Sequence, residues 1–157
     1  MHIRIIMILL GIGVFLPVLP THAAGVVGDG TPASCTRDAL ATALASGGEI
    51  RFNCGSAPVT IPIAATLDIR TAATIDGGGL VTLDGQGTTR IMYVNKLSAG
   101  TKLTLRNLTL ANGRSSGFEP SFGGCVYARQ SAVDLIDVTF TAVGRATVLR
   151  SMSTAAR

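Results

Sequence analysis

Apolar and polar residues alternate strictly along residues 101–113, TKLTLRNLTLANG, and the same alternation returns thirty residues later. A period of two is typical of a β-strand with one buried face. In the second copy Asp137 replaces Asn107, and each copy predicts two short strands that meet at this polar corner. The apolar positions predicted to face the core are Leu103, Leu105, Leu108 and Leu110, then Val133, Leu135, Val138 and Phe140.

Short alternating runs, each ended by Gly, Asn or Asp, also fill the chain upstream of this repeat. They predict strands at 50–52, 59–63, 67–69, 73–75, 81–83 and 91–95, with Ile69, Ile75 and Leu83 in the core. Strands this short do not suit a sandwich, and the one Asn-Gly pair, Asn112-Gly113, precedes a loose excursion rather than an equal strand. A repeat that stacks like residues on like predicts instead an all-β solenoid.

One segment between the leader and the strands has a helical pattern, at about residues 36–46. Ser34 or Thr36 provides an N-cap, and the Gly pair at 47–48 ends the helix. Its narrow apolar stripe is suited to cover the open end of a stacked β core. We therefore expect a cap at 25–58, coils at 59–144, and an atypical tail at 145–157 that is disordered or truncated.

Residues 1–24 have the order of a signal peptide, with Arg4, then an apolar run, then small residues before a cleavage site after Ala23 or Ala24. The apolar run is shorter than the roughly 20 residues that a bilayer requires. No later apolar run is long enough to span a membrane either. The leader predicts an exported chain, extracellular or at the cell surface or outer membrane, with no membrane-spanning segment once it is removed.

The charge balance bears on possible partners. The formal net charge is +4, and the basic residues form no block. Tyr93 and Tyr127 are far apart in the sequence and are not interleaved with basic residues. This pattern gives no nucleic-acid footprint.

Three cysteines remain to be explained in an exported chain. An oxidising compartment favours a disulfide between Cys35 and Cys54, which would close a loop around the predicted helix. Cys125 opens an apolar run and suits the role of a small buried hydrophobe. The alternative, a catalytic nucleophile, lacks a base, because the two histidines, His2 and His22, lie in the predicted leader.

Two groups of residues are candidates for ligand binding. Asp76 and Asp84 each precede Gly, where a carboxylate caps a turn, and the alternative is that they share a Ca²⁺ site. Phe118 and Phe122 flank Pro120 in the loop 114–122, where they either contact a partner or fold back onto the protein. Partners of such a surface would be extracellular polysaccharide or cell-surface components.

Four segments together resemble the N-terminal part of a known group of proteins: SCTRDALATALASGGEIRFNCG, TIDGGGLVTLDGQGTTRIMYV, LTLRNLTLANGRSSG and GGCVYARQSAVDLIDVTF. The group is the secreted bacterial right-handed parallel β-helix proteins of the pectate-lyase-like superfamily, including polymorphic outer-membrane-protein-like and CSLREA-type surface proteins. The resemblance implies a right-handed parallel β-helix of about three to four coils, with an N-terminal cap that contains one short α-helix.

The sequence departs from this pattern at Ala128-Arg129-Gln130 and again after Phe140, where the next turn and coil do not follow. We therefore expect the tail to be truncated. Three functions remain open. The first is a non-catalytic structural or adhesive surface protein, and the second is a fragment of a polysaccharide lyase or glycoside hydrolase. The third is a carbohydrate-binding module, which would require a row of exposed aromatic residues.

Overall fold

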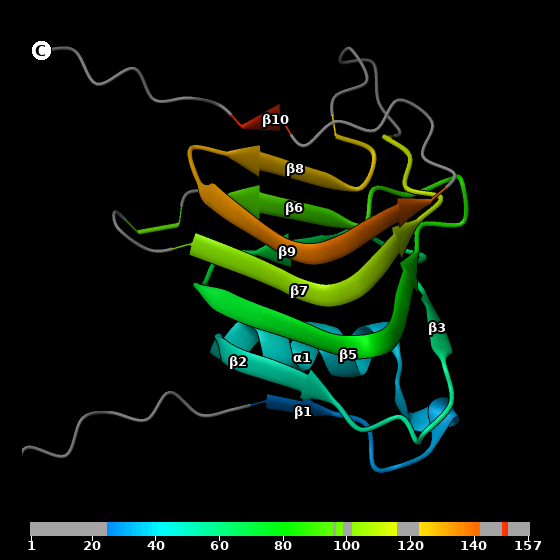
Figure 1. The fold of residues 1–157 in the computed structure, drawn as a ribbon. Helices are drawn as coiled ribbons and strands as arrows, with labels where there is room; N and C mark the ends of the chain where they lie inside the picture. Colours follow the sequence, from blue (N-terminus) through cyan, green and yellow to red (C-terminus); the bar gives the residue numbers. More distant parts are fainter. Residues whose placement is uncertain (1–24, 96, 99–101, 116–122, 142–148, 151–157) are drawn as a thin grey trace, which may run out of the picture.

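The computed structural model describes residues 25–95, 97–98, 102–115, 123–141 and 149–150 (Figure 1). The predicted leader and the candidate binding residues Phe118 and Phe122 lie outside this described part. Among the described residues, no helix has both the length and the apolar character needed to cross a bilayer.

The chain is built almost entirely of strands, with one α-helix in the described part. In chain order the elements are β1 (Gly25–Val27), the 3₁₀ helix η1 (Pro32–Ser34), α1 (Arg37–Ser46), β2 (Gly48–Phe52), β3 (Val59–Pro62), β4 (Leu67–Ile69), β5 (Ala73–Asp84), β6 (Met92–Asn95), β7 (Lys102–Ala111), β8 (Val126–Arg129), β9 (Ala132–Thr141) and β10 (Leu149–Arg150). The prediction of an all-β chain with a single short helix is confirmed.

The strands form two sheets in which all recorded pairs are parallel. One sheet has the order β1-β2-β5-β7-β9 with β3 beside β5, and the other has the order β10-β8-β6-β4. From β4 onward the chain alternates between the two sheets (Figure 1). Two residues of the predicted atypical tail, Leu149 and Arg150, form β10 and pair with β8.

The thirty-residue repeat corresponds to the pairing of β7 with β9. Leu103 pairs with Val133 and Leu105 with Leu135 before the corner, and Leu108 pairs with Val138 after it. The register predicted from the sequence is confirmed at these positions. Like residues therefore lie beside like residues on adjacent strands, which keeps the apolar face continuous from one strand to the next.

The polar corner bends a strand without dividing it. Asn107 and Asp137 have φ of 51° and 52°, the left-handed region that Asn and Asp tolerate. In β5 the same bend is made by glycines, so the two strands predicted at 73–75 and 81–83 are one strand with a register shift. Gly77 is required here, because a Cβ would lie 2.5 Å from Cβ of Leu108.

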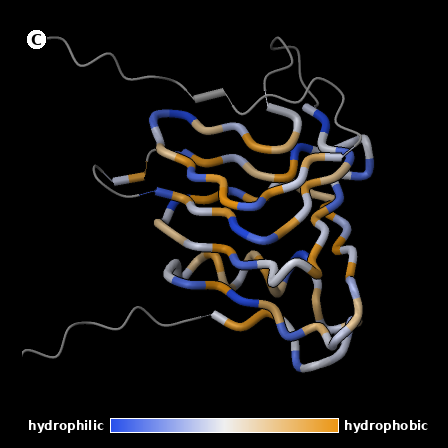
Figure 2. The backbone as a smooth tube through the Cα atoms, viewed as in Figure 1, coloured by the Kyte–Doolittle hydropathy of each residue, from blue (hydrophilic) through white to orange (hydrophobic). Residues whose placement is uncertain are grey.

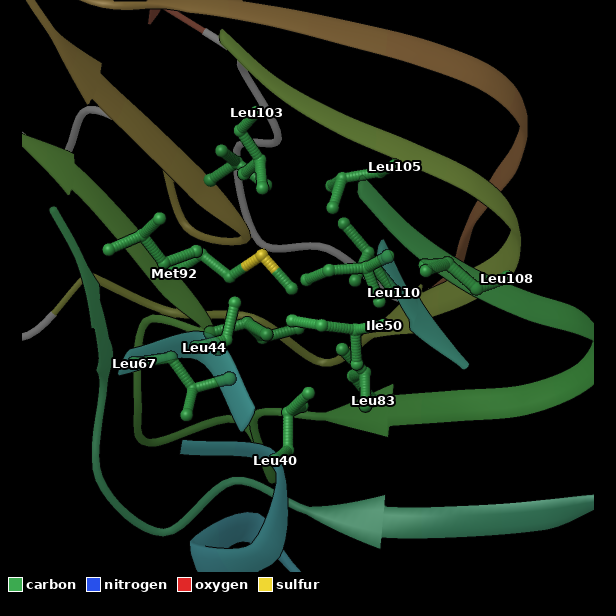
Figure 3. Packing of buried hydrophobic residues seen from close by; sticks show 14 of the residues in the cluster. Leu40, Leu44, Ile50, Leu67, Leu83, Met92, Leu103, Leu105, Leu108 and Leu110 are labelled. Atoms are coloured by element: carbon green, nitrogen blue, oxygen red, sulfur yellow. The ribbon is translucent and has the colours of Figure 1, made fainter. Parts of the chain in front are cut away.

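The core fills the space between the two sheets and α1 (Figure 3). Leu103, Leu105 and Leu110 are fully buried, as are Ile75 and Leu83. Figure 2 shows the matching alternation of hydrophobic and hydrophilic residues along the strands.

The predicted core positions in β9 are less enclosed than those in β7. Leu135 is 37% exposed, and Val133, Val138 and Phe140 are half-buried. The prediction of a closed core at Leu135 is wrong, because β9 is the last strand of its sheet in the described part and no strand stacks beyond it.

The helix α1 covers the opposite end of the core, packing on β1, β2 and β4. Thr36 caps it by accepting a hydrogen bond from the backbone N–H of Ala39 at 3.1 Å, and Gly47 ends it with a φ of 68°. The buried side chains of Leu40 and Leu44 face the core. A disulfide joins Cys35 to Cys54, whose Cα atoms lie 5.7 Å apart, and it encloses α1 in a loop.

Candidate functional site

The outward face of the first sheet carries a row of charges that neutralise one another. Arg106 on β7 donates from Nη2 to Oε1 of Glu49 at 2.5 Å and from Nε to Oδ2 of Asp76 at 3.0 Å. Arg51 donates to the same oxygen of Glu49 at 3.0 Å. Because Arg51, Asp76 and Arg106 are register partners, basic and acidic residues alternate across β2, β5 and β7.

Asp76 is the most enclosed member of this row, with 18% of its side chain exposed. Its Oδ1 accepts hydrogen bonds from the backbone N–H of Gly78 and from Nδ2 of Asn107, both at 3.0 Å. Burial pushes the pKa of Asp76 upward, but the bonds from Asn107 and Gly78 and the charge of Arg106 outweigh it. The pKa of Asp76 therefore lies below its ordinary value, and the carboxylate is ionised at neutral pH.

Asp84 repeats this arrangement at the end of β5. Its Oδ1 accepts hydrogen bonds from the backbone N–H of Gln86 at 2.7 Å and from Nδ2 of Asn112 at 2.9 Å. Each of the two aspartates predicted as turn caps thus caps its own turn. Each also holds an asparagine of the following repeat, which is a contact that sequence reasoning missed.

The structure does not bring Asp76 and Asp84 together in one site. Asp76 lines an open cavity of about 380 Å³ at the bend of the first sheet, and Asp84 does not. In the part of the chain that is described, no three His, Cys, Asp or Glu side chains lie close enough to hold a metal ion. The positions of these two residues therefore do not support a shared Ca²⁺ site.

The corner residues contribute to the same cavity. Its lining residues share short polar side chains or none, and they are Asp76, Gly78, Gly79, Asn107, Thr109, Asp137 and Thr139, with Leu108. Asn107 and Asp137 occupy equivalent places in successive strands, as predicted, but the amide of Asn107 bonds back to Asp76. The cavity presents hydroxyl and carboxylate oxygens, which suit ligand hydroxyl groups or water.

The outward face of the second sheet carries an aromatic pair. Tyr93 on β6 and Tyr127 on β8 are register partners, and their rings stack at 5.6 Å between centroids and 7° between planes. The sequence analysis noted only that these tyrosines are far apart along the chain and did not predict that they pair. The signal was their spacing of 34 residues within the similar runs Ile91–Val94 and Cys125–Ala128.

Arg90 contacts this pair and bonds to two residues on the adjoining chain, Ser115 and Gly123. Its guanidinium carbon lies 4.9 Å from the ring centroid of Tyr127, a cation–π contact. Its Nε donates to the carbonyl of Gly123 at 3.0 Å, and its Nη2 donates to Oγ of Ser115 at 2.9 Å. Ser115 and Gly123 lie on either side of residues 116–122, so Arg90 connects both flanking residues to the tyrosine face.

Cys125 lies in the core beside this face and is 2% exposed. Burial raises the pKa of its thiol, and a hydrogen bond from the backbone of Gly113 opposes this only in part. The thiol is therefore protonated at neutral pH, and the described part of the chain holds no histidine that would activate it. These features agree with the predicted role of a small buried hydrophobe.

Comparison of the chain with protein-family models, with curated proteins and with solved structures gives no match.

Proposed function

We propose that the chain is a segment of a right-handed parallel β-helix of about three to four coils, closed at one end by a helix-bearing cap. Support comes from the alternation of the chain between two parallel sheets and from the thirty-residue register between β7 and β9. In such a solenoid each coil contacts its neighbours, so lateral faces repeat along its length. The resemblance to the pectate-lyase-like superfamily agrees with this architecture.

On this fold we propose an exported, non-catalytic protein of the cell surface or extracellular space, with a structural or adhesive role. The observation that carries the proposal is the way the outward acidic side chains are used. Glu49 and Asp76 bond to side chains of β7, and Asp84 bonds to Asn112 just after β7. Such bonds tie the strands together and leave these carboxylates committed to structure. The Cys35–Cys54 disulfide suits the oxidising compartment that an exported chain meets.

Export is tested by expressing the full chain and determining the N-terminus of the protein recovered outside the cytoplasm. We expect it to begin at Ala24 or Gly25, since cleavage follows Ala23 or Ala24. Leu10→Arg, which places a charge in the apolar run of the leader, should leave the chain unprocessed and inside the cell. Leu80→Arg, at an exposed site of the folded part, is the matched control and should be processed normally. Recovery of a chain that begins at Met1 would contradict the proposal.

A second candidate function, carbohydrate binding, is favoured by the Tyr93–Tyr127 stack. Tyrosine presents a flat apolar ring with a polar hydroxyl group. This combination suits a sugar, which has an apolar face of C–H groups and hydroxyl groups around its edge. The two rings are parallel and half-exposed, and Arg90 contacts the ring of Tyr127. We infer that this face is where the adhesive role would act, with extracellular polysaccharide as the partner.

Depletion of the protein from solution by insoluble cellulose, chitin or pectin tests this face. We expect Tyr127→Ala to weaken binding up to about tenfold, since an aromatic contact is worth about 0.5–1.5 kcal/mol. Tyr127→Phe keeps the ring and should bind like the parent chain. A parent chain that binds none of these polymers, or a Tyr127→Ala variant that binds equally well, would contradict carbohydrate binding here. Release of new chain ends from the polymer would instead support the lyase or hydrolase alternative.

A further inference from the structure

A row of threonines crosses the outward face of the first sheet after the bend, over the strands β3, β5, β7 and β9 (Figure 1). Its members are register partners from strand to strand: Thr60, Thr82, Thr109 and Thr139. The residues that flank each threonine pack in or against the core, so the threonines themselves point outward. Neighbouring strands lie about 4.8 Å apart, so this threonine row repeats one hydroxyl and one methyl group at that interval over about 14 Å.

The hydroxyl groups of the threonine row are open to a ligand, because they form no hydrogen bond with the other described residues. Thr60 and Thr139 are exposed, and Thr82 and Thr109 are half-buried. Threonine is β-branched and stiff at χ1, so a ligand that bonds to these groups immobilises little side-chain motion. A further strand beside β9 would lengthen the row and would leave this face outward.

The cavity at the bend adjoins the threonine row. Thr109 and Thr139 line it together with Asp76 and Asp137, and its volume of about 380 Å³ suits a small ligand group. Asp76 is neutralised by Arg106, whereas Asp137 is exposed and has no ion pair among the described residues. The carboxylate of Asp137 can therefore accept a hydrogen bond from a ligand hydroxyl group, and its charge would repel an anionic ligand.

We propose that the threonine row and the adjoining cavity form a binding site for an uncharged, β-1,4-linked polysaccharide chain that lies across the strands. An extended chain of this kind advances per sugar by nearly the distance between adjacent strands, so successive sugars meet successive threonines. Sugar hydroxyl groups bond to the threonine hydroxyls, and the C–H face of each sugar packs on the methyl groups. The site lies on the other sheet from the tyrosine pair and offers no aromatic ring. It rests on the proposed function only in that an exported chain meets such polymers.

Isothermal titration calorimetry with cellohexaose and chitohexaose, on the full chain produced in an oxidising compartment, tests the proposal. The Tyr127→Ala variant is the reference, so that the tyrosine face does not contribute, and it should bind at least one of the two hexasaccharides. Adding Thr82→Val and Thr109→Val removes two hydroxyl groups but keeps the branched shape, and should weaken binding about tenfold. Adding Thr104→Val instead removes a half-buried hydroxyl group of β7 before the bend, outside the cavity, and should change nothing.

A reference variant that binds neither hexasaccharide, or that binds equally well without the two threonine hydroxyls, would overturn the proposal. Failure of the tyrosine face would appear differently, as equal binding by the parent chain and by Tyr127→Ala. The two sites can therefore fail independently of each other.

A change that strengthens binding keeps the test independent of any loss of fold. Hexagalacturonate should bind the reference variant about fivefold more weakly than the neutral hexasaccharide, the effect of about one like charge in water. Asp137→Asn removes that charge, and Asn tolerates the φ of 52° at this position. It should raise the affinity for hexagalacturonate about fivefold without weakening that for the neutral chain. Hexagalacturonate that binds the reference variant as tightly as the neutral chain would overturn the proposal.

Discussion

Replacing Leu105 with Ala is expected to lower the free energy of unfolding by about 2–5 kcal/mol, the range for removing a large aliphatic side chain from a core. Leu105 is fully buried and lies in the middle of the inward row, between Ile75 of β5 and Leu135 of β9. Neighbours on both sides are held by strand pairing, so the surroundings have little freedom to collapse into the space left behind. Urea denaturation followed by circular dichroism gives the free energy.

Leu80→Ala is the matched control for this substitution. Leu80 lies at the bend of β5 and is 39% exposed, so much of its side chain already contacts water. Its replacement should cost about 1 kcal/mol or less. Equal losses for the two variants would mean that Leu105 is not in the core, and the strand register inferred here would then be wrong.

The fold could be predicted where a single strand contains its own evidence. Strict alternation around Leu105 fixes which residues face inward, and recurrence after thirty residues fixes which residues become neighbours. The cap of α1 was equally local, because Thr36 and Gly47 mark its ends with side chains and backbone freedom that helices require. Both signals depend on residues that are close in the sequence or that recur with the same apolar or polar character in a repeat.

The candidate site was less predictable because it depends on side-chain contacts between different strands, which are far apart in the sequence. Arg106 bonds to Glu49, which is 57 residues away in the sequence. No pattern near either residue indicates that the two side chains are in contact. Tyr93 and Tyr127 are paired by the second sheet, whose strands β4, β6 and β8 have only three or four residues, so the similarity of the runs Ile91–Val94 and Cys125–Ala128 is a weaker signal than the thirty-residue repeat. The bend of β5 is built from glycines, and in the sequence a run of glycines predicts a turn between two strands. Its equivalence to the bend at Asn107 of β7 becomes visible only when the two strands lie side by side.

Removing the disulfide should cost about 3 kcal/mol of stability. Cys35 and Cys54 are 19 residues apart, and the bond limits the freedom of that loop in the unfolded chain. The loop contains α1, which covers the end of the core through Leu40 and Leu44. A Cys35→Ala/Cys54→Ala variant should therefore unfold at lower urea concentration. Amide hydrogen exchange should show the largest loss of protection in α1 and β1, because the loop holds that end together.

Two comparisons separate the covalent bond from the loss of buried sulfur. Cys125→Ala removes a buried thiol that closes no loop, so it should cost only about 1 kcal/mol. A reductant should destabilise the parent chain and leave the double variant unchanged, since that variant has no disulfide to lose. If the parent chain had the same free energy of unfolding with and without reductant, the packing of α1 alone would hold the cap in place. The disulfide would then offer no argument for an oxidising compartment, and the case for export would rest on the leader.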